Sequence, residues 1–97
     1  TWAKTLASDV GKYNITVNST LTGYFNTERL KELNGAKAKS LGIPIAEVEK
    51  HMLSQVPVGR FGEPEEYGHL VTFLASEYAS FITGTNIPID GGLLKSL

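Results

Sequence analysis

Histidine is the side chain best suited to acid–base chemistry near neutral pH, and it is a frequent metal ligand. The chain has two, His51 and His69, and it has no cysteine. The two histidines fall in segments that we expect to form different helices, and neither stands in a carboxylate motif. We therefore expect both to be exposed or capping residues, and we expect no metal site. The lack of cysteine also excludes a disulfide framework and thiolate metal ligands.

A second group able to do chemistry is a glycine and a threonine that follow a β-branched run. Residues 15–21 alternate apolar and polar side chains and predict a strand, which ends at Thr22-Gly23. Ligands of open α/β sheets bind beyond the carboxyl ends of the strands, where Gly23 would let the backbone approach a flat ring closely. The hydroxyl of Thr27 can donate and accept hydrogen bonds. In the simpler alternative Gly23 only forms a turn and Thr27 only caps a helix. These local roles are compatible with ligand binding by the same residues.

Helices must position these residues, and the first is expected at the start of the chain. Residues 1–10 have a helical pattern that ends at Gly11. Their apolar stripe consists of Ala3, Leu6, Ala7 and Val10. We expect Trp2, which is large and aromatic, to be buried at a contact between helices.

Two helices are expected directly after the glycine and the threonine. The first is capped by Thr27 and covers residues 28–33, stops at Asn34-Gly35, and is followed by a further turn over residues 36–41. The second opens at Pro44 and covers residues 45–56. Its apolar stripe consists of Ile45, Val48, Met52 and Val56.

The last part of the chain predicts one more helix and one more strand. The helix starts at Pro64 and runs to about Ala75. Its buried side is expected to hold Leu70, Val71, Phe73 and Leu74. Residues 85–90 predict a strand, and Pro88 within it indicates a sheet edge or an unpaired N–H.

Strands separated by helices favour an α/β fold with parallel pairing. Two strands alone rarely form a stable sheet, so we expect neighbouring strands to precede this chain in a longer protein. The chain has 97 residues, is 41% hydrophobic and has a net charge of −1. These values argue against a disordered chain and against nucleic acid as the main partner, and no apolar run has the roughly 20 residues of a membrane helix.

Several segments, in the right order, resemble the short-chain dehydrogenases/reductases. Residues 18–27, NSTLTGYFNT, resemble that family's N-x-x-x-P-G-x-x-x-T pattern after its sixth strand. Residues 58–66, VGRFGEPEE, and residues 82–92, ITGTNIPIDGG, resemble later family segments. The resemblance covers the whole chain and is greatest to 3-oxoacyl-(acyl carrier protein) reductases and sugar or alcohol dehydrogenases. It implies the C-terminal part of a Rossmann-like doubly wound parallel sheet, with residues 1–97 belonging to one NAD(P)-binding domain.

The resemblance also implies roles for individual residues. Gly23, Phe25 and Thr27 would bind the nicotinamide side of NAD or NADP, with Phe25 acting through its backbone. This chain has Thr22 where the family usually has proline, which is expected to loosen that loop. Residues of about 28–56 would form the substrate lid. The candidates to face the substrate are Tyr24, Leu30, Leu33, Met52 and Leu53. Asp90 would have a structural role near subunit contacts.

The family's catalytic tyrosine is followed four residues later by a lysine, which lowers the phenol's pKa. None of the four tyrosines has a lysine at that distance. The resemblance places this pair, and the family's serine, ahead of Thr1, so no catalytic residue is assigned here and the 97 residues alone are expected to be inactive. The glycine-rich phosphate loop is also not among these residues.

The sequence thus predicts part of an oxidoreductase that interconverts a carbonyl and a secondary alcohol by hydride transfer. The resemblance further implies a cytoplasmic homo-oligomer, a tetramer or a dimer, that acts on a small molecule. The alternative is a non-catalytic module that acts in oligomer or partner contact. A tyrosine and a lysine four residues apart just ahead of Thr1 would favour the enzyme.

Overall fold

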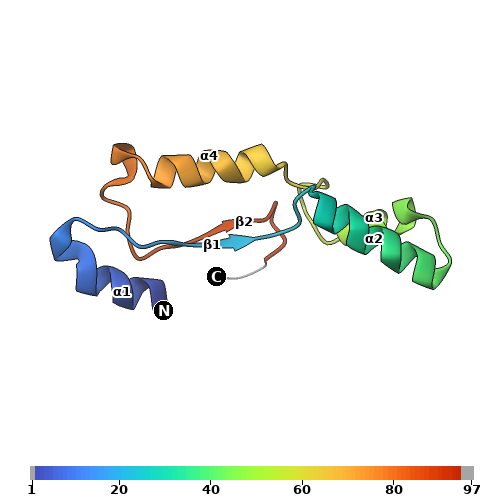
Figure 1. The fold of residues 1–97 in the computed structure, drawn as a ribbon, viewed down its shortest axis with the longest axis horizontal. Coiled ribbons are helices and arrows are strands. Elements are labelled where there is room, and N and C mark those ends of the chain that lie inside the picture. The colour runs from blue at the N-terminus through green and yellow to red at the C-terminus, as the bar shows by residue number, and fades with distance from the viewer. Residues whose placement is uncertain (1, 95–97) are drawn as a thin grey trace. The chain divides into compact units, whose positions relative to one another are not determined.

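The computed structural model describes residues 2–94. Its regular elements, in chain order, are α1 (Trp2–Val10), β1 (Ser19–Thr22), α2 (Glu28–Leu41), α3 (Ile45–Leu53), α4 (Pro64–Leu74) and β2 (Asn86–Ile89), with short 3₁₀ turns at Gly11–Tyr13 and Glu77–Ala79 (Figure 1). The chain forms two compact units. The first contains the residues up to 21 and residues 65–89, and the second contains residues 22–64 and those from 90 onward.

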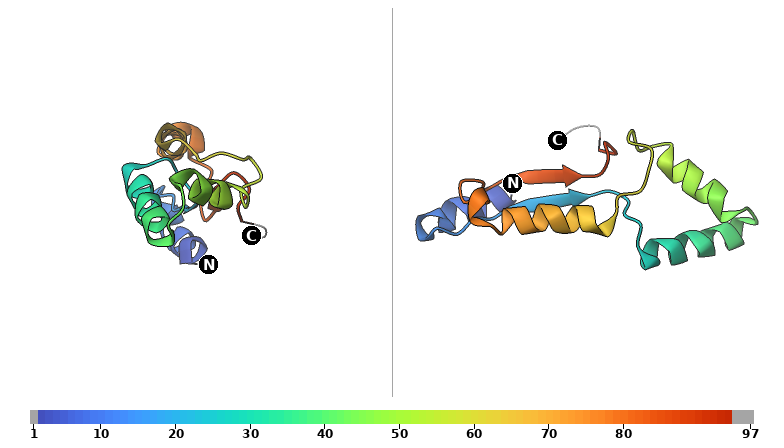
Figure 2. Two further views of the ribbon diagram at one scale, coloured as in Figure 1. Left: turned by 90° about the vertical axis from the view of Figure 1, so that its right-hand side faces the viewer. Right: turned by 90° about the horizontal axis from the view of Figure 1, so that it is seen from above.

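The first unit is built on a two-stranded sheet in which β1 pairs with β2. The two strands point the same way in both side views, so they are parallel (Figures 1 and 2). This confirms the α/β class and the parallel pairing. The expected strand over residues 15–21 is wrong at its start, because β1 begins only at Ser19. Val17 donates its N–H to the hydroxyl of Thr83 at 3.0 Å, while its carbonyl accepts the backbone N–H of Gly84 at 2.7 Å.

Asn18 joins the entry of β1 to the entry of β2. Its Nδ2 donates to the carbonyl of Ile82 at 3.1 Å. Its Oδ1 accepts from the backbone N–H of Thr85 at 3.2 Å and from the Thr85 hydroxyl at 2.5 Å. One amide therefore satisfies three polar groups on the segment that leads into β2.

Helix α4 runs along the two strands in the opposite direction (Figure 1). The hydroxyls of Tyr67 on α4 and Thr20 on β1 lie 2.9 Å apart and share a hydrogen bond. The predicted helix is confirmed, but its expected buried side is wrong in part: Val71 and Phe73 are each 44% exposed. A sheet of two strands is too narrow to cover the whole apolar surface of this helix.

Helix α1 buries its small residues and exposes its largest one. Ala3 and Ala7 are buried, as the apolar stripe predicted. Trp2 is 73% exposed, so the expected burial at a contact between helices is wrong. Successive residues are turned by roughly 100° around a helix, and Trp2 therefore points away from the alanine face.

The second unit contains a hairpin of α2 and α3 (Figure 2). The expected stop at Asn34-Gly35 is wrong, because α2 continues through both residues to Leu41 and ends at Gly42, whose φ is 68°. Asn34 and Ala38, one helical turn apart, are both buried on the inner face of α2. Packing of this face outweighs the poor helix propensity of the Asn-Gly pair.

Helix α3 is shorter than the expected 45–56. It ends at Leu53, and Ser54 occupies its C-cap. Val56 lies beyond the helix but is still buried, because its N–H donates to the carbonyl of Leu53 at 3.0 Å and folds the chain back in a turn. Val48 is buried as predicted.

Candidate functional site

The predicted cofactor loop starts at Gly23, directly after β1. A Cβ atom on Gly23 would lie 2.7 Å from the Cα and 2.8 Å from the Cβ of Asp90. Real Cβ atoms do not tolerate such distances, so glycine is required where this loop passes the end of β2. Approach to Asp90 thus accounts for the glycine, and the predicted approach to a nicotinamide ring stays a prediction.

The middle of the loop is fixed by an isolated parallel bridge between Phe25 and Gly62. The N–H of Asn26 donates to the carbonyl of Gly62 at 2.8 Å, and the N–H of Gly62 donates to the carbonyl of Tyr24 at 2.9 Å. A Cβ on Gly62 would lie 2.8 Å from the ring of Phe25. These contacts join the loop to Gly62, and the loosening expected from Thr22 in place of proline stays a prediction.

Thr27 is the N-cap of α2. Its hydroxyl oxygen accepts the N–H of Leu30 at 3.2 Å, which confirms the predicted cap. Its own N–H donates to the carbonyl of Phe25 at 2.9 Å. A hydroxyl also carries one hydrogen, and that hydrogen has no acceptor within residues 2–94. Because Thr27 is exposed, this donor remains available to a ligand.

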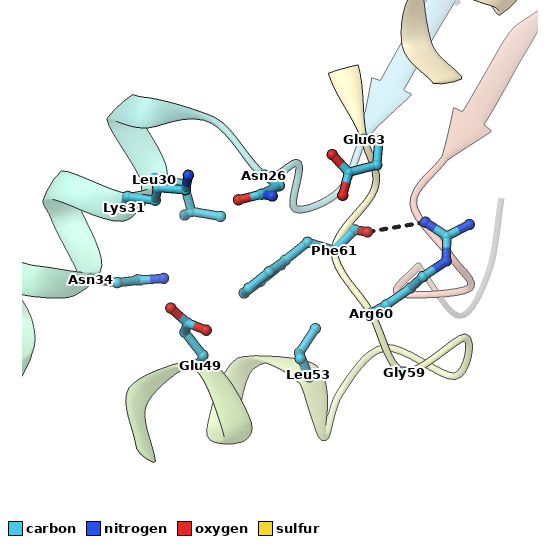
Figure 3. A pocket seen from close by; sticks show the side chains of 10 residues that line it. All are labelled: Asn26, Leu30, Lys31, Asn34, Glu49, Leu53, Gly59, Arg60, Phe61 and Glu63. Carbon is cyan, nitrogen blue, oxygen red and sulfur yellow. Dashed lines mark hydrogen bonds between the residues drawn. The ribbon is translucent and has the colours of Figure 1, made fainter. Parts of the chain in front are cut away.

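A cavity of about 360 Å³ lies within the second unit, between the helical hairpin and the segment before α4 (Figure 3). Its walls come from the loop, from α2 and α3, and from residues 59–63. The lining residues are Asn26, Leu30, Lys31, Asn34, Glu49, Leu53, Gly59, Arg60, Phe61 and Glu63.

Two of the predicted lid residues, Leu30 and Leu53, line this cavity together. Tyr24 and Met52 are half-buried but are not part of its lining. Leu33 is 54% exposed and lies outside the lining as well.

The polar members of the lining, above all Asn34 and Glu49, were not predicted from the sequence. The signal for Asn34 was its spacing, since it stands four residues after Leu30 and four before Ala38 on one face of α2. Phe61 and Arg60 lie in a segment whose family resemblance was seen without a role for either side chain.

The residues after β2 are shaped by Asp90. Its Oδ1 accepts the N–H of Gly92 at 2.9 Å, and its Oδ2 accepts the N–H of Leu94 at 2.9 Å. The carboxylate thus caps the turn that closes the described chain. This agrees with a structural role for Asp90, while the predicted subunit contact stays a prediction.

The two histidines do not converge on the cavity. His51 on α3 and His69 on α4 are both exposed. Among the described residues there is no group of three histidine, aspartate or glutamate side chains placed to hold a metal ion. Residues 2–94 also include no helix that is long and apolar enough to cross a membrane.

The chain thus combines a parallel α/β unit with a glycine loop and a helical hairpin. A family model described as enoyl-(acyl carrier protein) reductase matches residues 1–94. The 3-oxoacyl-[acyl-carrier-protein] reductase of Pseudomonas aeruginosa is 36% identical over 95 residues, which are 98% of this chain and 34% of that protein. The corresponding reductase of Thermotoga maritima is 40% identical over 94 residues, 97% of this chain and 32% of that protein.

Solved structures agree with these matches. A short chain dehydrogenase family protein from Francisella tularensis superposes with a TM-score of 0.89 at 38% identity, covering 95% of this chain and 38% of that one. L-sorbose reductase from Gluconobacter frateurii, solved with NADPH and L-sorbose, also has a TM-score of 0.89, at 33% identity, covering 99% of this chain and 37% of that one. The chain belongs to the short-chain dehydrogenase/reductase family. It spans about a third of the length of the curated relatives it matches.

Proposed function

We propose that this chain is the C-terminal part of an NAD(P)-dependent oxidoreductase that interconverts a carbonyl and a secondary alcohol. The observation that carries the proposal is the loop after β1, which the bridge between Phe25 and Gly62 holds in place and which leads directly into the hairpin with its cavity. The P. aeruginosa and T. maritima relatives are named as reductases, and the sorbose reductase was solved with NADPH. These relatives support a nicotinamide cofactor and leave the choice between NAD and NADP open.

The residues present fit the nicotinamide half of such a cofactor. The exposed hydroxyl of Thr27 keeps a donor that suits the carbonyl oxygen of a carboxamide. When bound, the nicotinamide ring supplies or accepts the hydride. In this proposal Gly23, Phe25 and Thr27 position the ring, while the acid–base tyrosine and lysine come from residues ahead of Thr1.

The hairpin is proposed as the substrate lid, over residues of about 28–56. Leu30 and Leu53 would contact the substrate from the cavity wall. The exposed apolar side chains of Val71 and Phe73 on α4 support burial against further parts of the protein or against a second subunit in a dimer or tetramer.

The test is a nicotinamide titration of the protein expressed from its complete gene, with Thr27→Val and Thr27→Ser. Loss of one hydrogen bond of about 0.5–1.5 kcal/mol predicts that Thr27→Val weakens cofactor binding roughly 2- to 12-fold. Thr27→Ser keeps the hydroxyl and is expected to bind like the parent. Quenching of protein fluorescence by the reduced cofactor gives both dissociation constants.

A cap substitution also weakens α2, so a control must separate the two effects. Glu32→Gly lies on the exposed side of the same helix and costs about 0.5–1 kcal/mol of helix stability without touching Thr27. If Glu32→Gly weakens cofactor binding as much as Thr27→Val does, the hydroxyl has no direct role. A protein that neither binds a nicotinamide cofactor nor turns over any alcohol or carbonyl would favour the non-catalytic module instead.

A further inference from the structure

Three segments of the second unit meet at a tight turn formed by residues 90–92. The chain passes this turn once on its way into the helical hairpin, at Gly23, and once on its way out, at residues 56–58. All three segments belong to the second unit. The turn therefore touches the chain on both sides of the hairpin.

On the entry side of the hairpin, main chain packs against main chain. A Cβ on Gly23 would lie 2.7 Å from the Cα of Asp90 and 3.1 Å from its carbonyl oxygen. Main-chain atoms cannot rotate away as the end of a long side chain can. A displacement of Asp90 is therefore passed directly to the proposed cofactor loop, which continues through Phe25 to Thr27.

On the exit side, the turn holds the return segment of the hairpin by a hydrogen bond and by close packing. The N–H of Val58 donates to the carbonyl of Gly91 at 3.0 Å. A Cβ on Gly91 would lie 2.9 Å from Cγ1 of Val56, which is buried. A Cβ on Gly92 would lie 2.9 Å from Cγ of Pro57. The return segment thus lies directly against the main chain of the turn.

The shape of the turn depends on the side chain of Asp90. Gly91 and Gly92 have φ angles of 63° and 92°, so two successive residues adopt a left-handed conformation. The Asp90 carboxylate accepts the N–H of Gly92 at 2.9 Å and that of Leu94 at 2.9 Å. Within residues 2–94 it forms no hydrogen bond with either neighbouring segment. The carboxylate therefore acts on both segments through the conformation of the turn.

We propose that residues 90–92, the anchor turn, hold the cofactor loop and the cavity wall in a fixed relation, with Asp90 as the positioning residue. The cavity wall formed by residues 59–61 starts directly after Val58, which the turn holds (Figure 3). Hydride transfer requires the nicotinamide ring and the substrate in a defined orientation. One turn that holds both sides supplies that alignment before either ligand binds. This role in catalysis rests on the proposed oxidoreductase function, whereas the anchor is a property of the fold and is tested without turnover.

Hydrogen exchange of the protein expressed from its complete gene tests the anchor. Two peptides are followed, one covering residues 22–27 and one covering residues 56–62. Asp90→Ala removes both bonds of the carboxylate, and amides in both peptides are expected to exchange roughly tenfold faster or more. Asp90→Asn keeps one oxygen acceptor, and an intermediate rate is expected.

Gly84→Ala is the matched control for a general loss of stability. Gly84 belongs to the first unit and has a φ of 73°, and a Cβ there would lie no closer than 3.4 Å to the nearest atom, the Cα of Lys4. The variant strains a left-handed residue away from the anchor turn. Both peptides are expected to exchange as in the parent protein.

Binding and kinetics test the positioning role. Asp90→Ala is expected to raise both the dissociation constant of NADH or NADPH, whichever the parent binds, and the KM for cyclohexanone severalfold. A protein that is only less stable would lose kcat through its unfolded fraction and keep both constants. Gly84→Ala is expected to behave in that way.

The outcomes separate the anchor from the proposed function. If Asp90→Ala accelerates exchange in only one peptide, or in neither, the anchor is refuted and the oxidoreductase stands. If both peptides loosen but the dissociation constant and KM keep their parent values, the positioning role is refuted. If both peptides loosen while the parent protein neither binds a nicotinamide cofactor nor reduces any carbonyl, the proposed function is refuted and the anchor stands. Should Asp90→Ala fail to fold by circular dichroism, Asp90→Asn against Gly84→Ala decides by the same peptides.

Discussion

Gly23 and Gly35 offer a matched pair of substitutions with opposite expected signs. A Cβ at Gly23 would meet the Cα and Cβ of Asp90 at 2.7 and 2.8 Å, and the Asp90 carbonyl oxygen at 3.1 Å. The first and third of these are main-chain atoms, which cannot rotate away. A Cβ at Gly35, within α2, would meet no heavy atom within 4 Å.

The magnitudes follow from these surroundings. Overpacking at Gly23 is expected to cost about 1–3 kcal/mol for Gly23→Ala, since the main chain at Asp90 must shift. At Gly35 the added methyl group removes the entropic penalty of glycine in a helix, so Gly35→Ala is expected to stabilise by about 0.5–1 kcal/mol. The two variants should therefore differ by roughly 1.5–4 kcal/mol in the free energy of unfolding.

Urea unfolding of the protein expressed from its complete gene, followed by circular dichroism, measures both free energies. Equal m-values would show that the two variants expose the same amount of surface on unfolding, so that a difference in midpoint is a difference in stability. If Gly23→Ala is as stable as the parent, the close approach to Asp90 is not present in solution. If Gly35→Ala destabilises, α2 does not continue through the Asn-Gly pair, and the buried position of Asn34 is lost with it.

Two further substitutions test the first unit. Asn18→Ala removes three hydrogen bonds at the entry of the sheet and is expected to cost about 2–4 kcal/mol in urea unfolding, where a cost below about 0.5 kcal/mol would contradict the joining role of Asn18. The double-mutant cycle of Thr20→Val and Tyr67→Phe is expected to give a coupling energy of about 0.5–1.5 kcal/mol for the hydroxyl pair, and additive effects would place α4 away from β1.

Much of the fold was predictable because local signals agree with the global arrangement. Thr27 caps α2, as its residue type and its position before the helix predicted. The order of strand, helix and strand predicted the parallel pairing of β1 with β2. At these positions, local preference and tertiary packing favour the same structure.

The strand boundary was not predictable from alternation alone. Residues 15–18 have the β-branched pattern of a strand, yet only residues from Ser19 pair with β2. Before that point one backbone bond, from the N–H of Gly84 to the carbonyl of Val17, is combined with bonds in which the Thr83 hydroxyl and the Asn18 amide oxygen accept backbone N–H groups. A hydrophobic pattern indicates which faces are apolar, but it does not indicate where side chains begin to share in the backbone hydrogen bonding.

Asn34 shows why the helix boundary and the polar lining of the cavity were missed together. In the local sequence, Asn-Gly is a turn signal and predicts that the helix ends there. A residue at a helix end was not expected to share a buried helix face with Leu30 and Ala38. Once α2 is continuous, the same residue becomes a buried amide in the wall of a cavity. A sequence optimised only for helix stability and packing would favour an apolar residue there. Local preference and tertiary packing therefore disagree at Asn34, and the packing of α2 decides the structure there.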